Sequence, residues 1–138
     1  MRKSVKSMVD DAMQVITTYN IEQAQSLHGR DDVQFIDLRD VRELEHEGVI
    51  PGAFHAPRGM LEFWVDPESP YHKPVFSQPG PRYVLFGAAG GRAALATRTM
   101  QDMGLSDVAH IDGGFTAWKA AGAPVAEKAS KPKPAKAD

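Results

Sequence analysis

The order of strand-like and helix-like segments predicts an α/β fold built on a mainly parallel sheet. Five short runs rich in β-branched and aromatic residues alternate with segments whose apolar residues recur every three or four positions. Several of the helical segments end at a glycine, the residue that most often terminates a helix. With 138 residues, of which 42% are hydrophobic, the chain is long enough for one domain with a sizeable core.

The first half of the chain supplies three of the five strands. In chain order we expect a helix at 4–15, a strand at 16–19, a helix at 20–27 capped by Asn20, a strand at 33–37, a helix at 41–47, a turn at 50–53 and a strand at 53–56. The run at 33–37 reads as a buried strand, because both of its faces carry apolar residues.

The second half supplies the other two strands and a long connection. We expect a helix at 60–65, a Pro-rich surface loop at 67–81, a strand at 83–86, a helix at 92–103, a strand at 108–111 and a last helix between Gly113 and Gly122. Residues 1–15 are predicted as an N-terminal helix and 16–125 as the domain. Residues 126–138, rich in Lys, Ala and Pro, lack large apolar side chains and are predicted to be a disordered tail.

Composition excludes several classes of function. The chain has no cysteine, which rules out disulfides, thiolate metal sites and cysteine catalysis. The five histidines are scattered singly, so no metal and no cofactor is expected. A net charge of −2 argues against nucleic acid, and no apolar run is long enough for a membrane. Asp10 and Asp11 interrupt any signal peptide, so we expect a cytoplasmic location.

The most informative segment is a glycine-rich loop between the strand at 83–86 and the helix that follows it. Backbone N–H groups and a helix N-terminus converge in such a loop and can surround an anion. We predict that a small oxyanion (sulfate, phosphate or thiosulfate) binds there, held also by a guanidinium. The predicted anion-binding residues are Gly87, Ala88, Ala89, Gly90, Gly91, Arg92 and Ala93. The alternative is that the glycines only make a tight turn.

Four segments give the chain a family resemblance. They are Ile-Asp-Leu-Arg at 36–39, Glu-Gly-Val-Ile-Pro-Gly-Ala at 47–53, the loop and helix at 87–103, and Asp-Gly-Gly-Phe-Thr-Ala-Trp at 112–118. In this order they resemble the single-domain rhodaneses, which are sulfurtransferases, over about residues 16–125. The resemblance implies a three-layer rhodanese-like fold, in which helices flank a central, mainly parallel, five-stranded sheet.

The same resemblance implies that the nucleophile is missing. In this family the loop begins with a cysteine and ends with an arginine five positions later, so Arg92 places the nucleophile position at Gly87. That cysteine takes a sulfur atom from a donor such as thiosulfate and passes it on as a persulfide. Glycine has no thiol, so no catalytic residue and no sulfurtransferase activity are expected. The related phosphatases also need a cysteine, and their loop is one residue longer.

Two functions remain open. One is a noncatalytic module that binds an anion or a protein partner. The other is a thiosulfate sulfurtransferase whose cysteine at position 87 was removed. Serine or alanine is the usual engineered substitute for cysteine, so glycine at this position favours natural loss of the cysteine. As supporting residues we expect Asp37 and Arg39 to form a structural pair beside the loop. Arg58 and Trp64 belong to a segment that lies near the site in relatives, so we expect them to line it, with core packing as the alternative for Trp64.

Overall fold

A five-stranded sheet lies at the centre of the protein. The computed structural model describes residues 1–105 and 107–129. The strands are β1 (Thr17–Tyr19), β2 (Val33–Asp37), β3 (Phe54–His55), β4 (Arg82–Phe86) and β5 (Val108–Ile111). Their spatial order is β1-β5-β4-β2-β3, and every neighbouring pair runs parallel. The predicted α/β class and the parallel sheet are therefore confirmed.

The helices follow local signals in the sequence. They are α1 (Val5–Met13), α2 (Ile21–Leu27), α3 (Val41–Glu47), α4 (Leu61–Val65), α5 (Gly91–Met103) and α6 (Gly114–Ala120), with 3-10 turns η1 (Arg58–Met60) and η2 (Pro74–Ser77). Asn20 and Asp40 open α2 and α3 with capping boxes. Within the part of the chain that the structure describes, no helix is long and apolar enough to cross a membrane.

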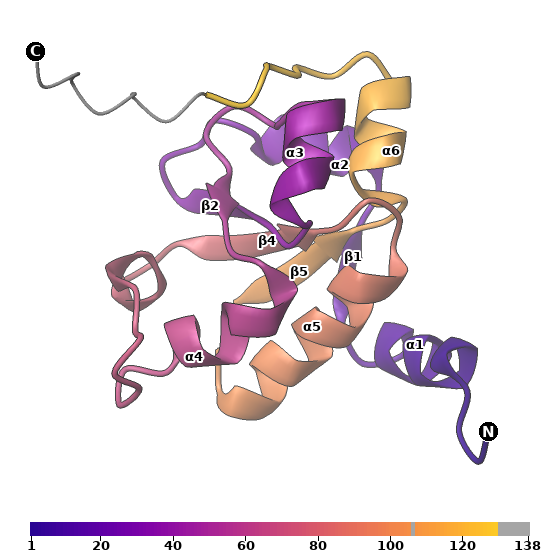
Figure 1. Cartoon of the computed structure of the whole chain (residues 1–138), viewed down its shortest axis with the longest axis vertical. Helices are drawn as coiled ribbons and strands as arrows, with labels where there is room; N and C mark the ends of the chain where they lie inside the picture. Colours follow the sequence, from indigo (N-terminus) through magenta and orange to yellow (C-terminus); the bar gives the residue numbers. More distant parts are fainter. Residues whose placement is uncertain (106, 130–138) are drawn as a thin grey trace, which may run out of the picture.

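The helices cover both faces of the sheet, so the fold has three layers. Figure 1 shows α2, α3 and α6 on one side and α1, α4 and α5 on the other. Successive side chains of a strand point to opposite faces. Accordingly, Phe35 belongs to the core cluster that contains Trp118 of α6, whereas Ile36 belongs to the cluster that contains Met100 of α5.

The connection at 67–81 differs from the surface loop that we expected. It contains the turn η2, where Phe76 is buried against the ring of Tyr83, with 5.6 Å between the ring centroids. The Tyr83 hydroxyl donates a 2.8 Å hydrogen bond to the carbonyl of Val75. The segment therefore adds the aromatic ring of Phe76 to the core beneath α4 and α5.

The end of the described chain is attached to the domain. Val49 and Ala126 exchange two backbone hydrogen bonds of 2.8 and 2.9 Å, as an antiparallel bridge. Ala126, the first residue of the predicted tail, is thus paired with the segment after α3. Residues 130–138 of that tail lie outside the described residues.

Candidate functional site

The glycine-rich loop, residues 87–93, lies at the carboxyl edge of the sheet. β2 and β4 are neighbours in the sheet, and Leu38 after β2 donates a 2.9 Å hydrogen bond to the carbonyl of Phe86. The next helices leave this edge toward opposite faces, α3 after β2 and α5 after β4 (Figure 1). In open parallel sheets, ligands bind where neighbouring connections diverge in this way. The fold therefore puts the predicted loop at the expected place for a ligand.

The start of α6 determines the shape of the loop. The backbone N–H groups of Phe115 and Thr116 donate hydrogen bonds of 2.8 and 2.9 Å to the carbonyls of Gly87 and Ala88. Gly114 has a φ of 58°, and a Cβ atom there would collide with the carbonyl oxygens of Gly87 and Ala89. Only glycine allows the two segments to approach so closely.

The N–H groups of the loop are left free. Among the described residues, no backbone N–H from Gly87 to Ala93 donates a hydrogen bond to the protein; the first to do so is that of Ala94, to the carbonyl of Gly90. The loop glycines, at 87, 90 and 91, all lack a positive φ, so none of them is needed for a left-handed turn. Gly87 is buried and Ala89 is exposed, so the loop runs from the core to the surface.

Arg92 is paired with a residue that the sequence did not single out. Its Nη1 and Nη2 donate hydrogen bonds of 2.8 and 2.9 Å to the two carboxylate oxygens of Glu43 on α3. The hydrogen bonds from Arg92 lower the pKa of Glu43 to about 2. The guanidinium that we expected to be free for an anion thus shares its charge with a carboxylate. The only sequence signal for Glu43 is its capping-box position after Asp40.

Asp37 and Arg39 form a buried ion pair beside the loop. Both side chains are at most 2% exposed, and Nη2 of Arg39 lies 2.7 Å from a carboxylate oxygen of Asp37. Nη2 also donates a 2.8 Å hydrogen bond to the carbonyl of Gly48, and the guanidinium lies 3.9 Å from the ring centroid of Phe115. The pair therefore links the end of β2, the end of α3 and the start of α6.

The structure places Arg58 and Trp64 elsewhere. Trp64 packs against the core cluster beneath α4, with its ring 6.1 Å from that of Phe54, which agrees with the core-packing alternative. Arg58 is paired with Glu62 and lines a groove formed with α1 and α5. Neither residue lines the pocket next to the loop.

That pocket lies between α3 and α6 and has a volume of about 320 Å³. We call it the α3–α6 pocket; its walls include Ala88 of the loop together with Arg39, Glu43, Glu47, Phe115, Lys119 and Ala120. Of these wall residues, the sequence predicted only Ala88 and Arg39 as part of a site. The others could not be predicted, because they come from two helices that are far apart in the sequence.

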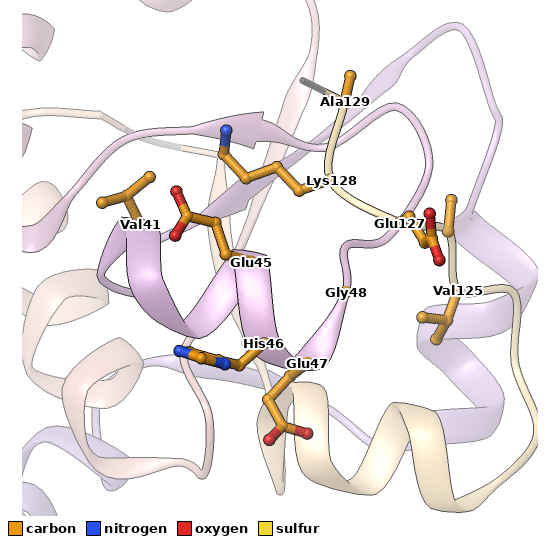
Figure 2. Close-up of a pocket in the computed structure, with 10 residues that line it drawn as sticks. Val41, Glu45, His46, Glu47, Gly48, Val125, Glu127, Lys128 and Ala129 are labelled. Carbon is orange, nitrogen blue, oxygen red and sulfur yellow. The ribbon is translucent and has the colours of Figure 1, made fainter. Parts of the chain in front are cut away.

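A larger groove, of about 940 Å³, lies on the outer side of α3. Figure 2 shows that Val41, Glu45 and His46 line it from α3, opposite the C-terminal segment Val125–Ala129. It does not include the 87–93 loop. Among residues 1–105 and 107–129, no group of three or more His, Asp or Glu side chains is arranged to hold a metal ion.

Comparison with known proteins defines the class. The family model of the rhodanese-like domain matches residues 20–121, which make up most of the chain. The protein therefore belongs to the rhodanese-like domain family, and its three-layer fold is the fold of that family.

Three solved structures show the range of this similarity. A Rhodopseudomonas palustris protein of unknown function, described as a possible tyrosine phosphatase, is 49% identical, with a TM-score of 0.89 over 91% of this chain and 96% of its own. A polysulfide-sulfur transferase homodimer from Wolinella succinogenes is 26% identical, with a TM-score of 0.68 over 89% of this chain and 87% of its own. A Pseudomonas aeruginosa thiosulfate sulfurtransferase shares the fold at 21% identity and a TM-score of 0.73, over 89% of this chain and 22% of its own.

Proposed function

We propose that this protein is a noncatalytic rhodanese-like module that binds a small oxyanion, free or carried on a protein partner, in the 87–93 loop. One observation carries the proposal: the backbone N–H groups of the loop have no acceptor among the described residues, at the start of a 13-residue helix. Such groups bind sulfate or phosphate well, because N–H dipoles and the helix dipole act together. Persulfide chemistry needs a thiolate, and the chain contains no cysteine.

The pair between Arg92 and Glu43 makes this binding weak. The Glu43 carboxylate already occupies two donors of the guanidinium and brings a negative charge close to the loop. The Nε atom of Arg92 makes no hydrogen bond among the described residues and lies 3.6 Å from the position that a Cβ atom of Gly87 would take. We therefore expect Arg92 to contribute Nε–H to an anion held mainly by backbone N–H groups.

An NMR titration with sulfate, phosphate and thiosulfate tests the proposal. The backbone amide signals of Gly87–Ala93 should shift at tens of millimolar anion. Arg92→Gln should weaken this binding, whereas Arg98→Gln should not, because Arg98 is exposed on the same helix and lines a different groove. The proposal fails if the loop signals do not shift with any of the three anions.

The second candidate function is a sulfurtransferase whose cysteine at position 87 was removed. The geometry around Gly87 favours retaining this candidate. A Cβ atom at Gly87 would meet only Arg92, at 3.6 Å, and the backbone there has no positive φ. The backbone and the space around Gly87 therefore allow a Cβ atom, which a cysteine there requires. The Gly87→Cys variant should be assayed for thiocyanate formed from thiosulfate and cyanide. Activity would show that only the nucleophile is missing, and its absence would show that the surrounding pocket has also changed.

Phosphatase activity is not part of the proposal. The R. palustris protein is described as a possible tyrosine phosphatase, but phosphatases of this architecture act through a cysteine nucleophile. This chain has glycine at the corresponding position, and it contains no cysteine elsewhere. Hydrolysis of p-nitrophenyl phosphate by the unmodified protein is the direct check, and we expect none.

A further inference from the structure

The α3–α6 pocket opens beside the anion-binding loop. Ala88 belongs to both, and its carbonyl is held by the N–H of Thr116 at 2.9 Å. A volume of about 320 Å³ is far more than an inorganic anion needs. It lies at the lower end of the range typical of small-molecule pockets, about 300–1,000 Å³. A ligand with its charged end on the loop could therefore extend into this pocket.

The charged groups around the pocket are paired with one another. Glu43 is held by Arg92, and Lys119 lies 3.5 Å from the carboxylate of Glu47 and donates a 3.0 Å hydrogen bond to the Glu47 carbonyl. The two carboxylates are thus balanced by two cations, and the wall between them is formed by Phe115 and Ala120. A neutral, partly apolar surface of this kind favours an uncharged, apolar part of a ligand.

One donor in the wall is unused. Arg39 is 1% exposed and lines the pocket, and its Nε and Nη2 donate to Asp37 and Gly48. Its Nη1 makes no hydrogen bond among the described residues. The Nη1 atom is not fully buried, so it offers a charged donor to a ligand that brings an oxygen atom into the pocket.

We propose that the ligand is an organic oxyanion with an aromatic body, such as an aryl phosphate or an arylsulfonate. Its oxyanion lies on the backbone N–H groups at Ala88, with Arg39 nearby, and its aromatic body lies against Phe115 and Ala120. This inference rests on the proposed anion-binding function and adds the class of ligand. Aromatic and aliphatic wall residues bind such a body by removing its apolar surface from water.

Comparison of phenyl phosphate with inorganic phosphate tests the inference. We expect phenyl phosphate to bind at least tenfold more tightly and to shift the NMR signals of Thr116–Ala120 as well as those of the loop. Ala120→Leu should fill the pocket and remove the tenfold preference while leaving the affinity for inorganic phosphate unchanged. Ala121→Leu is the matched control, because Ala121 is exposed at the end of α6 and does not line the pocket.

The outcomes separate this inference from the function on which it rests. Equal affinity for both phosphates, with shifts confined to residues 87–93, would overturn the aromatic ligand and leave anion binding intact. Absence of any shift with either compound would overturn both. A short phosphotyrosine peptide shows whether the aryl phosphate belongs to a protein or to a free molecule. If the peptide binds more tightly than phenyl phosphate, the ligand is an aryl phosphate on a protein. If it binds equally or more weakly, the ligand is a free molecule.

Discussion

The guanidinium of Arg92 on α5 holds the carboxylate of Glu43 on α3 through two hydrogen bonds, of 2.8 and 2.9 Å. The two helices lie on opposite sides of the sheet, so the pair joins them across the carboxyl edge of the strands (Figure 1). It also places a carboxylate where an anionic ligand would approach the loop. Glu43 is thus an internal competitor for the charge of Arg92.

Replacing this carboxylate should strengthen anion binding. In Glu43→Gln the guanidinium keeps a hydrogen-bonding neighbour but loses the negative charge that offsets it. We expect the affinity for sulfate to rise about threefold to tenfold, measured by NMR titration at low salt. Glu45→Gln is the control, because Glu45 is exposed on the same helix and has no ion-pair partner among the described residues. An equal gain in both variants would show only a change in net charge.

The same pair should make stability depend on pH in acid. Arg92 lowers the pKa of Glu43 from its ordinary 4.5 to about 2, so the folded state binds a proton less readily than the unfolded state. The stabilisation is therefore complete above pH 4.5 and is lost as the pH falls toward 2. Because the side chains are 43% and 32% exposed, solvent screening limits it to about 1 kcal/mol or less.

Urea denaturation of the wild type and of Glu43→Gln, at several pH values, measures this effect. The difference between their free energies of unfolding should be constant near neutral pH and should shrink below about pH 4.5. A difference that stayed constant down to about pH 3 would contradict the assigned pair.

The buried pair between Arg39 and Asp37 should matter far more to stability. Arg39→Ala leaves the Asp37 carboxylate buried without its partner, which costs about 3–5 kcal/mol. Arg42→Ala is the matched control, since the pair between Arg42 and Asp40 is exposed and is worth about 1 kcal/mol at most. Urea denaturation of both variants tests this, and similar losses would mean that burial does not decide the energy of these pairs.

Gly114 should tolerate no side chain. Gly114→Ala combines a positive φ with a collision against the carbonyls of Gly87 and Ala89. Gly122→Ala is the control, because Gly122 has a φ of 75° but open space around its Cβ position. We expect the control to cost about 1–2 kcal/mol and Gly114→Ala to cost about 1–3 kcal/mol more. Thermal unfolding gives both values; equal losses would show that the loop moves freely away from α6.

His110 should destabilise the fold in mild acid. It is fully buried on β5, and burial lowers its pKa below the ordinary 6.5. The unfolded state therefore takes up a proton first, and stability is lost as the pH falls below 6.5. His110→Leu should reduce the loss of stability between about pH 7 and pH 5, whereas His46→Gln, at an exposed site, should not. Unfolding curves with equal pH dependence in all three proteins would refute this.

The sequence was sufficient for the strands, the α-helices and the position of the loop, because their signals are local. Asn20 and Asp40 cap helices through their own side chains, and the apolar run at 83–86 forms the central strand β4. Parallel strands and the order of the elements then bring the loop to the carboxyl edge of the sheet.

Contacts between distant residues were not predictable in the same way. Glu43 and Arg92 are 49 residues apart, and nothing in the pattern around either residue names the other. Phe76 lies in a Pro-rich segment without periodicity, so its burial depends on Tyr83 and the core cluster rather than on its neighbours in the chain. Ala126 has no apolar pattern either, and its order comes from backbone hydrogen bonds to Val49.

The hydrogen bonds from Phe115 and Thr116 hold the loop from outside, and they go to the carbonyls of Gly87 and Ala88 rather than to any side chain. The course of the loop thus depends on backbone atoms that every residue possesses. The residue at position 87 can change while the loop keeps its shape, whereas the residue at 114 cannot. Under the proposed function, a single substitution at position 87 is therefore enough to separate recognition of an anion from chemistry on it.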